Sequence, residues 1–212
     1  HPLSIRKMPM IGKQTYSMLR SMGVATIGTL SAIPVEMMHK VLGKNGISLW
    51  KKANGIDNSP IIPWHDRKSI STERTFDRDT IDIHFLRELL ISMVEKIAFQ
   101  LRKEGKLTSC ISVKIRYSNF DTHTQQRHIA YTSFDHVLIN NALELFEKVY
   151  QRRLRVRLIG VRFSGLIPGL QQLDLFEKRP EMIDLYMAMD KMRLRYGSQA
   201  VRRAVGLRKE KL

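Results

Sequence analysis

The sequence predicts an α+β fold in two globular parts, a small all-helical domain followed by a four-stranded α/β domain and a helical tail. Short helical segments separated by turn formers fill residues 1–66. Strand and helix patterns then alternate across residues 67–165, and residues 166–212 return to helical spacing after a loop. These three patterns define the expected domain organisation.

The first domain is expected to hold three short helices. Apolar spacing places them at 15–22, 34–42 and 47–53, with Ser31 as a candidate cap for the second. Turn formers follow the third helix, and two prolines between residues 60 and 66 predict an extended linker.

The second domain alternates in the order β-α-β-β-α-β. Apolar residues at intervals of three and four predict two amphipathic helices, and β-branched and aromatic residues predict four strands. Together they suggest a four-stranded sheet with both helices on one face. The elements are strand 69–76, helix 82–104, strand 108–117, strand 125–132, helix 135–150 and strand 156–163. Regular structure is expected to stop at the glycines and proline of residues 166–171, and a last helix is expected over 180–205, either packed or mobile.

Composition indicates a soluble protein with a polyanionic partner. The chain has 212 residues with 36 Lys and Arg against 20 Asp and Glu, a formal charge of +16, which favours nucleic acid. A ribosomal or membrane-surface role is the alternative, but no basic helix carries a clean apolar stripe with Trp or Phe. A cytoplasmic location is expected, with Cys110 as a buried thiol. Because the sequence opens at His1 without an initiator Met, we expect a piece of a longer protein.

A tight turn at Gly12 and Lys13 is a candidate phosphate site. Pro9 and Gly12 open a helix whose first amides point outward with partial positive charge, and Lys13 adds a full charge. The pattern resembles a helix-hairpin-helix, which grips a DNA backbone without reading bases. An ordinary pair of packed helices remains the alternative.

The sheet face without helices is a second candidate surface. Basic residues on or beside the strands are Lys68, Arg74, Lys114, Arg116, Arg127, Arg155, Arg157 and Arg162. An open basic face suits a duplex backbone, and nearby hydroxyls add phosphate contacts. The proposed DNA-binding set here is Ser69, Ser71, Arg74, Arg116, Thr122, Thr124 and Arg157. The alternative is a set of solvated charges that keep the sheet soluble.

A short docking motif follows the last strand. Gln172, Leu173, Asp174, Leu175 and Phe176 place one amide before three apolar side chains, outside any long periodic element. Such a segment suits a pocket on another protein, with Leu and Phe as anchors and Gln fixing the register. It resembles the sliding-clamp-binding motif of bacterial DNA polymerases and repair proteins. An amphipathic edge of the domain is the alternative.

Taken together, the segments resemble the C-terminal half of Y-family translesion DNA polymerases of the DNA polymerase IV and UmuC (impB/mucB/samB) class. The motifs that carry the likeness, in the family's order, lie at residues 5–13, 23–30, 53–57, 68–76, 157–161 and 190–197. The resemblance implies a thumb, a little-finger domain and a clamp-binding tail. It also implies a parent DNA-directed DNA polymerase, a nucleotidyltransferase that uses magnesium in DNA repair, damage tolerance and the SOS response.

The chain departs from the family where catalysis would lie. The family's metal-binding carboxylates belong to palm and fingers domains, so no catalytic residue, metal site or cofactor is expected in this fragment. Asp77, Asp79 and Asp82 cluster and could mimic a metal site, but their position at a helix start favours helix-dipole and capping roles. Met10 stands where the family's hairpin commonly has a second Gly. We expect a monomer that binds primer-template DNA and the clamp, has no membrane partner and does not polymerise alone.

Two other functions fit parts of the pattern. The chain is alternatively a stand-alone, non-catalytic protein that binds DNA and a clamp. It is otherwise an RNA-binding module, which requires aromatic side chains on the central strands, and Tyr117 and Tyr131 are the candidates.

Overall fold

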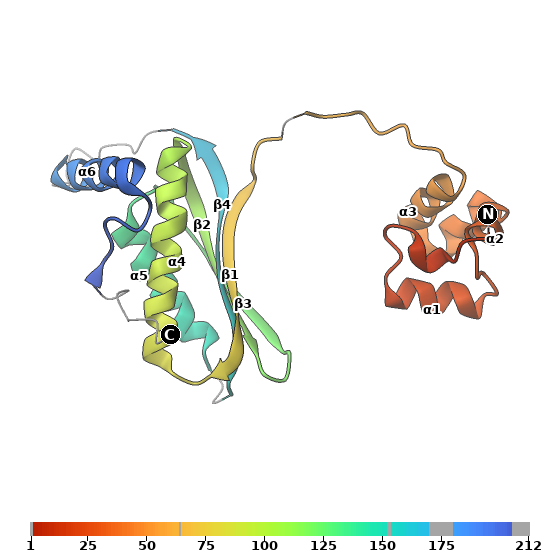
Figure 1. Ribbon diagram of the computed structural model, residues 1–212, viewed down its shortest axis with the longest axis horizontal. Helices are drawn as coiled ribbons and strands as arrows, with labels where there is room; N and C mark the ends of the chain where they lie inside the picture. Colours follow the sequence, from red (N-terminus) through yellow and green to blue (C-terminus); the bar gives the residue numbers. More distant parts are fainter. Residues whose placement is uncertain (1, 64, 152–153, 170–179, 205–212) are drawn as a thin grey trace. The chain divides into compact units, whose positions relative to one another are not determined.

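The computed structural model describes residues 2–63, 65–151, 154–169 and 180–204, and divides into two compact units. The units are His1–His65 and Asp66–Leu212, and each is described by itself (Figure 1). Among the described residues, no helix has the length and apolarity to cross a membrane.

The first unit is all helical. It contains the 3-10 turn η1 (Ile5–Lys7) and the helices α1 (Lys13–Ser21), α2 (Ile27–Ser31) and α3 (Val35–Ala53). The two later helices expected from the sequence are the halves of α3, which kinks at Gly43. Ser31 is not a cap, because it ends α2 and donates its hydroxyl to the Gly28 carbonyl, and Pro34 precedes α3 instead. The buried side chains of this core are Ile5, Met8, Leu19, Val24, Leu30, Met38, Leu49 and Ala53.

The second unit confirms the predicted β-α-β-β-α-β order. Its elements are β1 (Ser69–Thr80), α4 (Ile83–Lys103), β2 (Lys106–Tyr117), β3 (Thr122–Thr132), α5 (Asp135–Val149) and β4 (Val156–Pro168). The strands form one antiparallel sheet in the order β1-β4-β2-β3. Both helices cover the same face, as expected, and leave the other face open (Figure 1).

Two strand boundaries differ from the sequence prediction. β3 already begins at Thr122, because its polar first residues pair with the end of β2. β4 does not stop at residue 163 but runs to Pro168, which pairs with Lys106. Proline is tolerated there because the last position of a strand needs no amide donor.

The core of the second unit lies between the sheet and its two helices. Leu86, Leu90, Val94 and Leu101 of α4 meet the buried residues of β2 and β4. Asp82 caps α4, since its carboxylate accepts the backbone amide of Phe85 at 3.0 Å. Burying large aliphatic side chains contributes about 2 kcal/mol each, which makes this layer the main source of stability.

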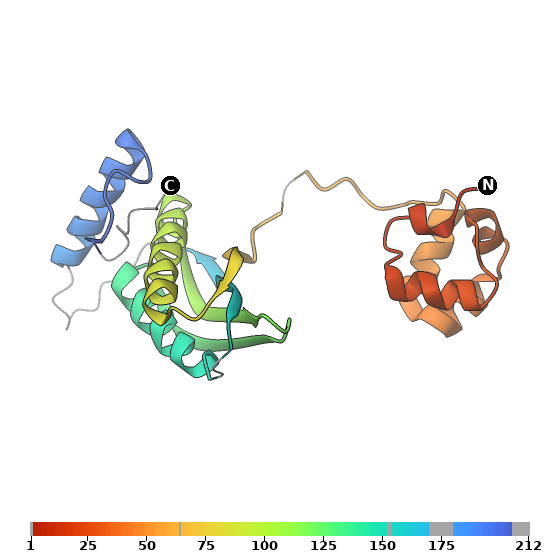
Figure 2. The same cartoon turned by 60° about the horizontal axis from the view of Figure 1, so that its bottom comes forward.

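The tail helix α6 (Pro180–Tyr196) packs on the helix side of the second unit, away from the sheet (Figures 1 and 2). The expected helix over 180–205 was too long, because Gly197 takes a φ of +97°, a conformation that ends helices and favours glycine. Tyr186 is almost fully buried, with its ring stacked beside Phe134 and His136. The tail is therefore part of the domain, and the packed alternative is the one that the structure bears out.

Candidate nucleic-acid interface

The first candidate contact is the N-terminus of α1. Gly12 is the N-cap residue, and no side chain caps the first amides of the helix. A hollow of about 440 Å³ opens there, lined by Arg6, Ile11, Gly12, Lys13 and Tyr16. Uncapped amides beside two cations are an arrangement that holds a phosphate. The sequence singled out Gly12 and Lys13, whereas Arg6 and Tyr16 come from the fold.

The turn before α1 departs from what its sequence favours. Met8 accepts the Ile11 amide at 3.4 Å, with Pro9 and Met10 as the central residues. Met10 is the third residue of this turn and has a φ of +72°. A positive φ at this position is typical of a type II turn, in which Gly is preferred there. Gly12 has an ordinary φ of −80°, and a Cβ there would meet no atom within 4 Å. The strain therefore lies at Met10.

The entry of α2 is closed, in contrast to that of α1. The hydroxyl of Thr26 accepts the Thr29 amide at 3.1 Å. The backbone around it pairs with the start of the chain, where the Ile5 amide donates to Ala25 at 3.2 Å. Residues 23–30 therefore hold the segment that precedes α1 and leave no open helix start of their own at α2.

The second candidate contact is the side of the sheet that carries no helix, here called the open face. Side chains alternate along each strand, so the strand register assigns them to one face or the other. The open face consists of Ser69, Ser71, Glu73 and Thr75 on β1, Leu158, Gly160, Arg162 and Ser164 on β4, Cys110, Ser112, Lys114 and Arg116 on β2, and Thr122, Thr124, Gln126 and His128 on β3. Seven of these sixteen residues are Ser or Thr, and three are Lys or Arg.

A glycine in the middle of the open face makes room for the side chain of Glu73. A Cβ at Gly160 would lie 2.7 Å from the Cγ of Glu73, so any other residue would force the neighbouring strand's side chain to move. Glu73 instead extends across Gly160 and pairs with the ammonium group of Lys114. This pair neutralises one of the cations that the sequence assigned to the surface.

Two arginines on the open face are not neutralised by a carboxylate of the described residues. Arg116 donates to the hydroxyl of Thr122 at 2.8 Å, and neither Arg116 nor Arg162 has a carboxylate partner among the described residues. Both therefore stand beside Ser and Thr hydroxyls as unneutralised cations. A negatively charged backbone would find charge and hydrogen-bond donors on one flat surface.

Other predicted residues lie elsewhere. Arg74 is paired with Ile159, a core residue, so the alternation of side chains places Arg74 on the helix-bearing side of β1. Arg127 also faces the helices and donates to Asn141 and Glu144 of α5 at 2.9 Å and 2.6 Å. Arg157 pairs with Asp79 at 3.6 Å, next to the hairpin that joins β2 and β3. Ser69, Ser71, Arg116, Thr122 and Thr124 do share the open face.

A buried ionic network fixes the tail. Arg102 of α4 donates to both carboxylate oxygens of Asp190 at 2.6 Å and 3.0 Å, and to Asp135 at 2.5 Å. Arg193 approaches Asp190 at 3.6 Å from the same helix. Asp135 is fully buried, and this burial raises the pKa of its carboxyl group despite the opposing Arg102.

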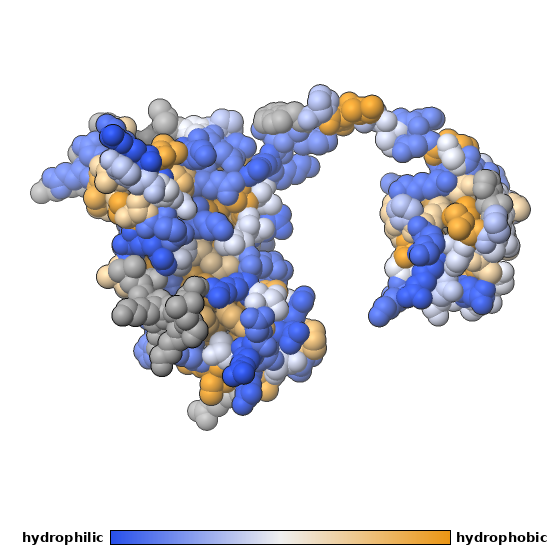
Figure 3. Space-filling view, in the orientation of Figure 1, coloured by the Kyte–Doolittle hydropathy of each residue, from blue (hydrophilic) through white to orange (hydrophobic). Residues whose placement is uncertain are grey.

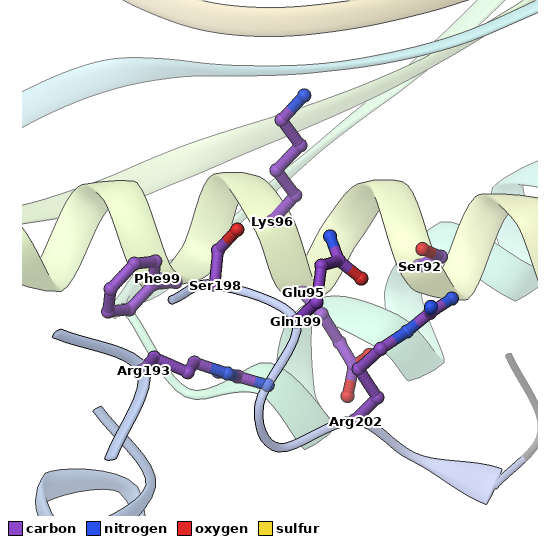
Figure 4. Close-up of a pocket in the computed structure, with 8 residues that line it drawn as sticks. All are labelled: Ser92, Glu95, Lys96, Phe99, Arg193, Ser198, Gln199 and Arg202. Carbon is purple, nitrogen blue, oxygen red and sulfur yellow. The ribbon is translucent and has the colours of Figure 1, made fainter. Parts of the chain in front are cut away.

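A second acid lies under the tail. Glu95 and Phe99 of α4 face Arg193 and Arg202 across a small cavity of about 70 Å³ (Figure 4). Arg203 forms an ion pair with Glu95, at 2.9 Å between Nε and Oε1. Burial raises the pKa of Glu95, and the charge on Asp135 raises it further.

The predicted clamp-binding residues lie outside the described part of the chain. Gln172, Leu173, Asp174, Leu175 and Phe176 all fall within residues 170–179. Beside α6, the described residues form an apolar groove of about 850 Å³, with Phe134, Ile183 and Met187 on its walls. Apolar side chains show near α6 on an otherwise largely hydrophilic surface (Figure 3).

Two expectations can be compared with the described residues directly. No three His, Cys, Asp or Glu side chains among them are grouped so that they could hold a metal ion. Tyr117, one of two candidate stacking rings for RNA, is fully buried and donates its hydroxyl to the Val149 carbonyl at 3.2 Å. A buried ring cannot stack on a base, so the RNA-binding alternative keeps only Tyr131 as a candidate.

Comparison with known proteins adds an independent finding. Residues 67–175 match the model of the impB/mucB/samB family C-terminal domain. The chain is 37% identical over 202 residues to DNA polymerase IV of Dehalococcoides mccartyi, covering 94% of this chain and 52% of that protein. It is 32% identical over 223 residues to DNA polymerase IV of Clostridium kluyveri, covering 99% and 56%. The chain thus spans about half the length of the curated relatives it matches.

Proposed function

Because the chain belongs to the impB/mucB/samB family of Y-family DNA polymerases, we propose that it grips primer-template DNA for an error-tolerant polymerase. The first unit acts as the thumb and the second as the little finger. The observation that carries the proposal is the open face, where Arg116 and Arg162 stand unneutralised among hydroxyl side chains.

The chemistry of this surface suits a DNA backbone more than a base sequence. Serine and threonine hydroxyls and arginines contact phosphate oxygens, and such contacts position a duplex without reading it. The hollow at Gly12 and Lys13 offers a second phosphate contact from the other unit. A polymerase that passes damaged bases needs a grip of this sequence-independent kind.

We propose further that residues 172–176 dock on the sliding clamp, which would keep the polymerase at the primer end. The whole protein would copy damaged templates in the cytoplasm with magnesium ions held by other domains. The present chain alone is then expected to bind DNA without extending a primer. Template-dependent primer extension by the purified chain would contradict the proposal that catalysis belongs to other domains.

Salt dependence of DNA binding tests the proposal. Each lost phosphate contact reduces the slope of log affinity against log salt by about 0.9. Changing Arg116→Ala together with Arg162→Ala should flatten the slope by roughly 2 units, and should weaken binding to unrelated duplex sequences about equally.

Arg74→Ala is the matched control, since it removes an exposed arginine from the opposite face of the same sheet. It should leave the slope unchanged. An equal slope for the double variant and the wild type would remove the open face from the proposed function. Loss of slope in the Arg74 variant alone would place the DNA on the helix side.

A further inference from the structure

The tip of the β2–β3 hairpin carries an unusual residue. Phe120 has a φ of +68° and its side chain is 63% exposed. The left-handed conformation costs a bulky residue about 1 kcal/mol or more, and Gly or Asn would fit the position without that cost. An exposed apolar ring in a strained conformation gains little stability from burial, so its presence suggests a functional constraint.

Hydrogen bonds fix the turn that carries the ring. The Phe120 amide donates to Tyr117 at 2.9 Å, and the Tyr117 amide donates to Asp121 at 2.9 Å. The Asn119 side chain bonds the Asp121 amide at 3.1 Å and its carboxylate at 2.8 Å. A ring on a fixed turn loses little conformational entropy when it binds a ligand.

The surroundings are those of a base-stacking site. The guanidinium carbon of Arg157 lies 4.9 Å from the centre of the Phe120 ring, a cation–π arrangement. Thr122, which bonds Arg116, belongs to the open face and follows the tip directly. In both Figures 1 and 2 the hairpin tip projects away from α4 and α5. The ring therefore lies at the margin of the proposed phosphate-binding surface.

We propose that Phe120 and Arg157 form a stacking site for an unpaired nucleobase of single-stranded DNA. A base inside a duplex has both faces covered by its neighbours, so only an unstacked base can lie against the ring. This inference rests on the proposed function, because it supposes that the open face holds DNA. It adds a contact to the base, whereas the open face contacts the backbone.

The test measures binding of the full chain to a single-stranded oligonucleotide that carries 2-aminopurine, and to a matching duplex. Stacking of 2-aminopurine on the ring is expected to quench its fluorescence when the single strand binds. Stacking of one base contributes about 1–3 kcal/mol, so Phe120→Ala should weaken single-strand binding about tenfold and abolish this quench. Duplex affinity should change less than about twofold, and the salt slope should stay the same because no charge is lost. Phe120→Trp should keep the quench.

Two controls separate stacking from structure. Phe120→Gly relieves the positive φ, so it should fold at least as stably as the wild type and still lose the quench. Tyr196→Ala removes another exposed ring under an arginine, with Arg195 at 5.3 Å, and should leave single-strand binding unchanged.

Wild-type quench and affinity in Phe120→Ala, with duplex binding intact, would overturn the stacking site while leaving the proposed function standing. Equal losses on single strand and duplex would also overturn it, since a base contact would not weaken both. A wild-type chain that binds neither DNA would reject the proposed function itself.

Discussion

The ionic anchor of α6 allows one prediction to be worked through from the structure. Arg102 makes two hydrogen bonds to Asp190 at 2.6 Å and 3.0 Å, and the two side chains are 13% and 15% exposed. Asp190→Asn removes the charge from this pair with almost no change in shape. Breaking a buried ion pair typically costs about 3–5 kcal/mol, because the remaining charge is left uncompensated. Since Asp135 still holds Arg102, we expect the lower end, about 3 kcal/mol.

Helix α4, which carries Arg102, also provides a matched control. Arg87 of α4 pairs with Glu147 of α5 at 2.6 Å, but these side chains are 43% and 60% exposed. Glu147→Gln should therefore cost less than about 1 kcal/mol, since solvent screens an exposed pair. Both variants remove the charge from a carboxylate that lies 2.6 Å from an arginine, so the comparison sets a buried pair against an exposed one.

Urea unfolding combined with amide hydrogen exchange measures the effect. If docking of α6 contributes more free energy than the lost pair, the free energy of unfolding of the second unit should fall by about 3 kcal/mol in the Asp190 variant. If docking is worth less, the tail should detach locally, and the amides of α6 should exchange much faster than those of α4. Protected amides in α6, together with a free energy of unfolding equal to that of Glu147→Gln, would refute the reasoning.

Three further predictions concern other sites. Burial raises the pKa of Glu95 above its ordinary 4.5, so stability is fully present below that pH and falls as pH rises through the raised pKa. Glu95→Gln should therefore melt higher than the wild type at neutral pH, with the two melting curves converging in acid; a lower melting temperature at neutral pH would show that the Arg203 pair outweighs burial. Met10→Gly should stabilise the first unit by up to about 1 kcal/mol, because Gly adopts the positive φ without strain. Thermal unfolding followed by Trp50 fluorescence measures this change, and a lower stability of the variant would contradict strain in the turn. Leu175→Ala with Phe176→Ala should abolish micromolar binding to the sliding clamp in a titration and leave DNA affinity unchanged; equal clamp binding by both proteins would exclude the motif.

The order of elements and the layering of the second unit followed from the sequence alone. Apolar residues of α4 recur at three and four positions, and those of β2 and β4 alternate, so each segment reports its own conformation through neighbours a few residues away. The same local logic identified Asp82 as a cap and the positive charge as a sign of a nucleic-acid partner. Where the sequence failed on boundaries, at β4 and α6, pairing with a distant strand and a single glycine decided the ends.

The composition of the candidate interface was decided only by tertiary structure. Arg74 and Arg116 look alike in sequence, yet the strand register places them on opposite faces, because a shift of one residue reverses every side chain. Register depends on how whole strands pack against the helices, which no local pattern encodes. The pairing of Lys114 with Glu73 across Gly160 and of Arg102 with Asp190, and the position of Arg157 over Phe120, all join residues far apart in the chain. The sequence therefore determined which elements form and what charge they carry, whereas the packing of distant segments determined which charges remain free to bind.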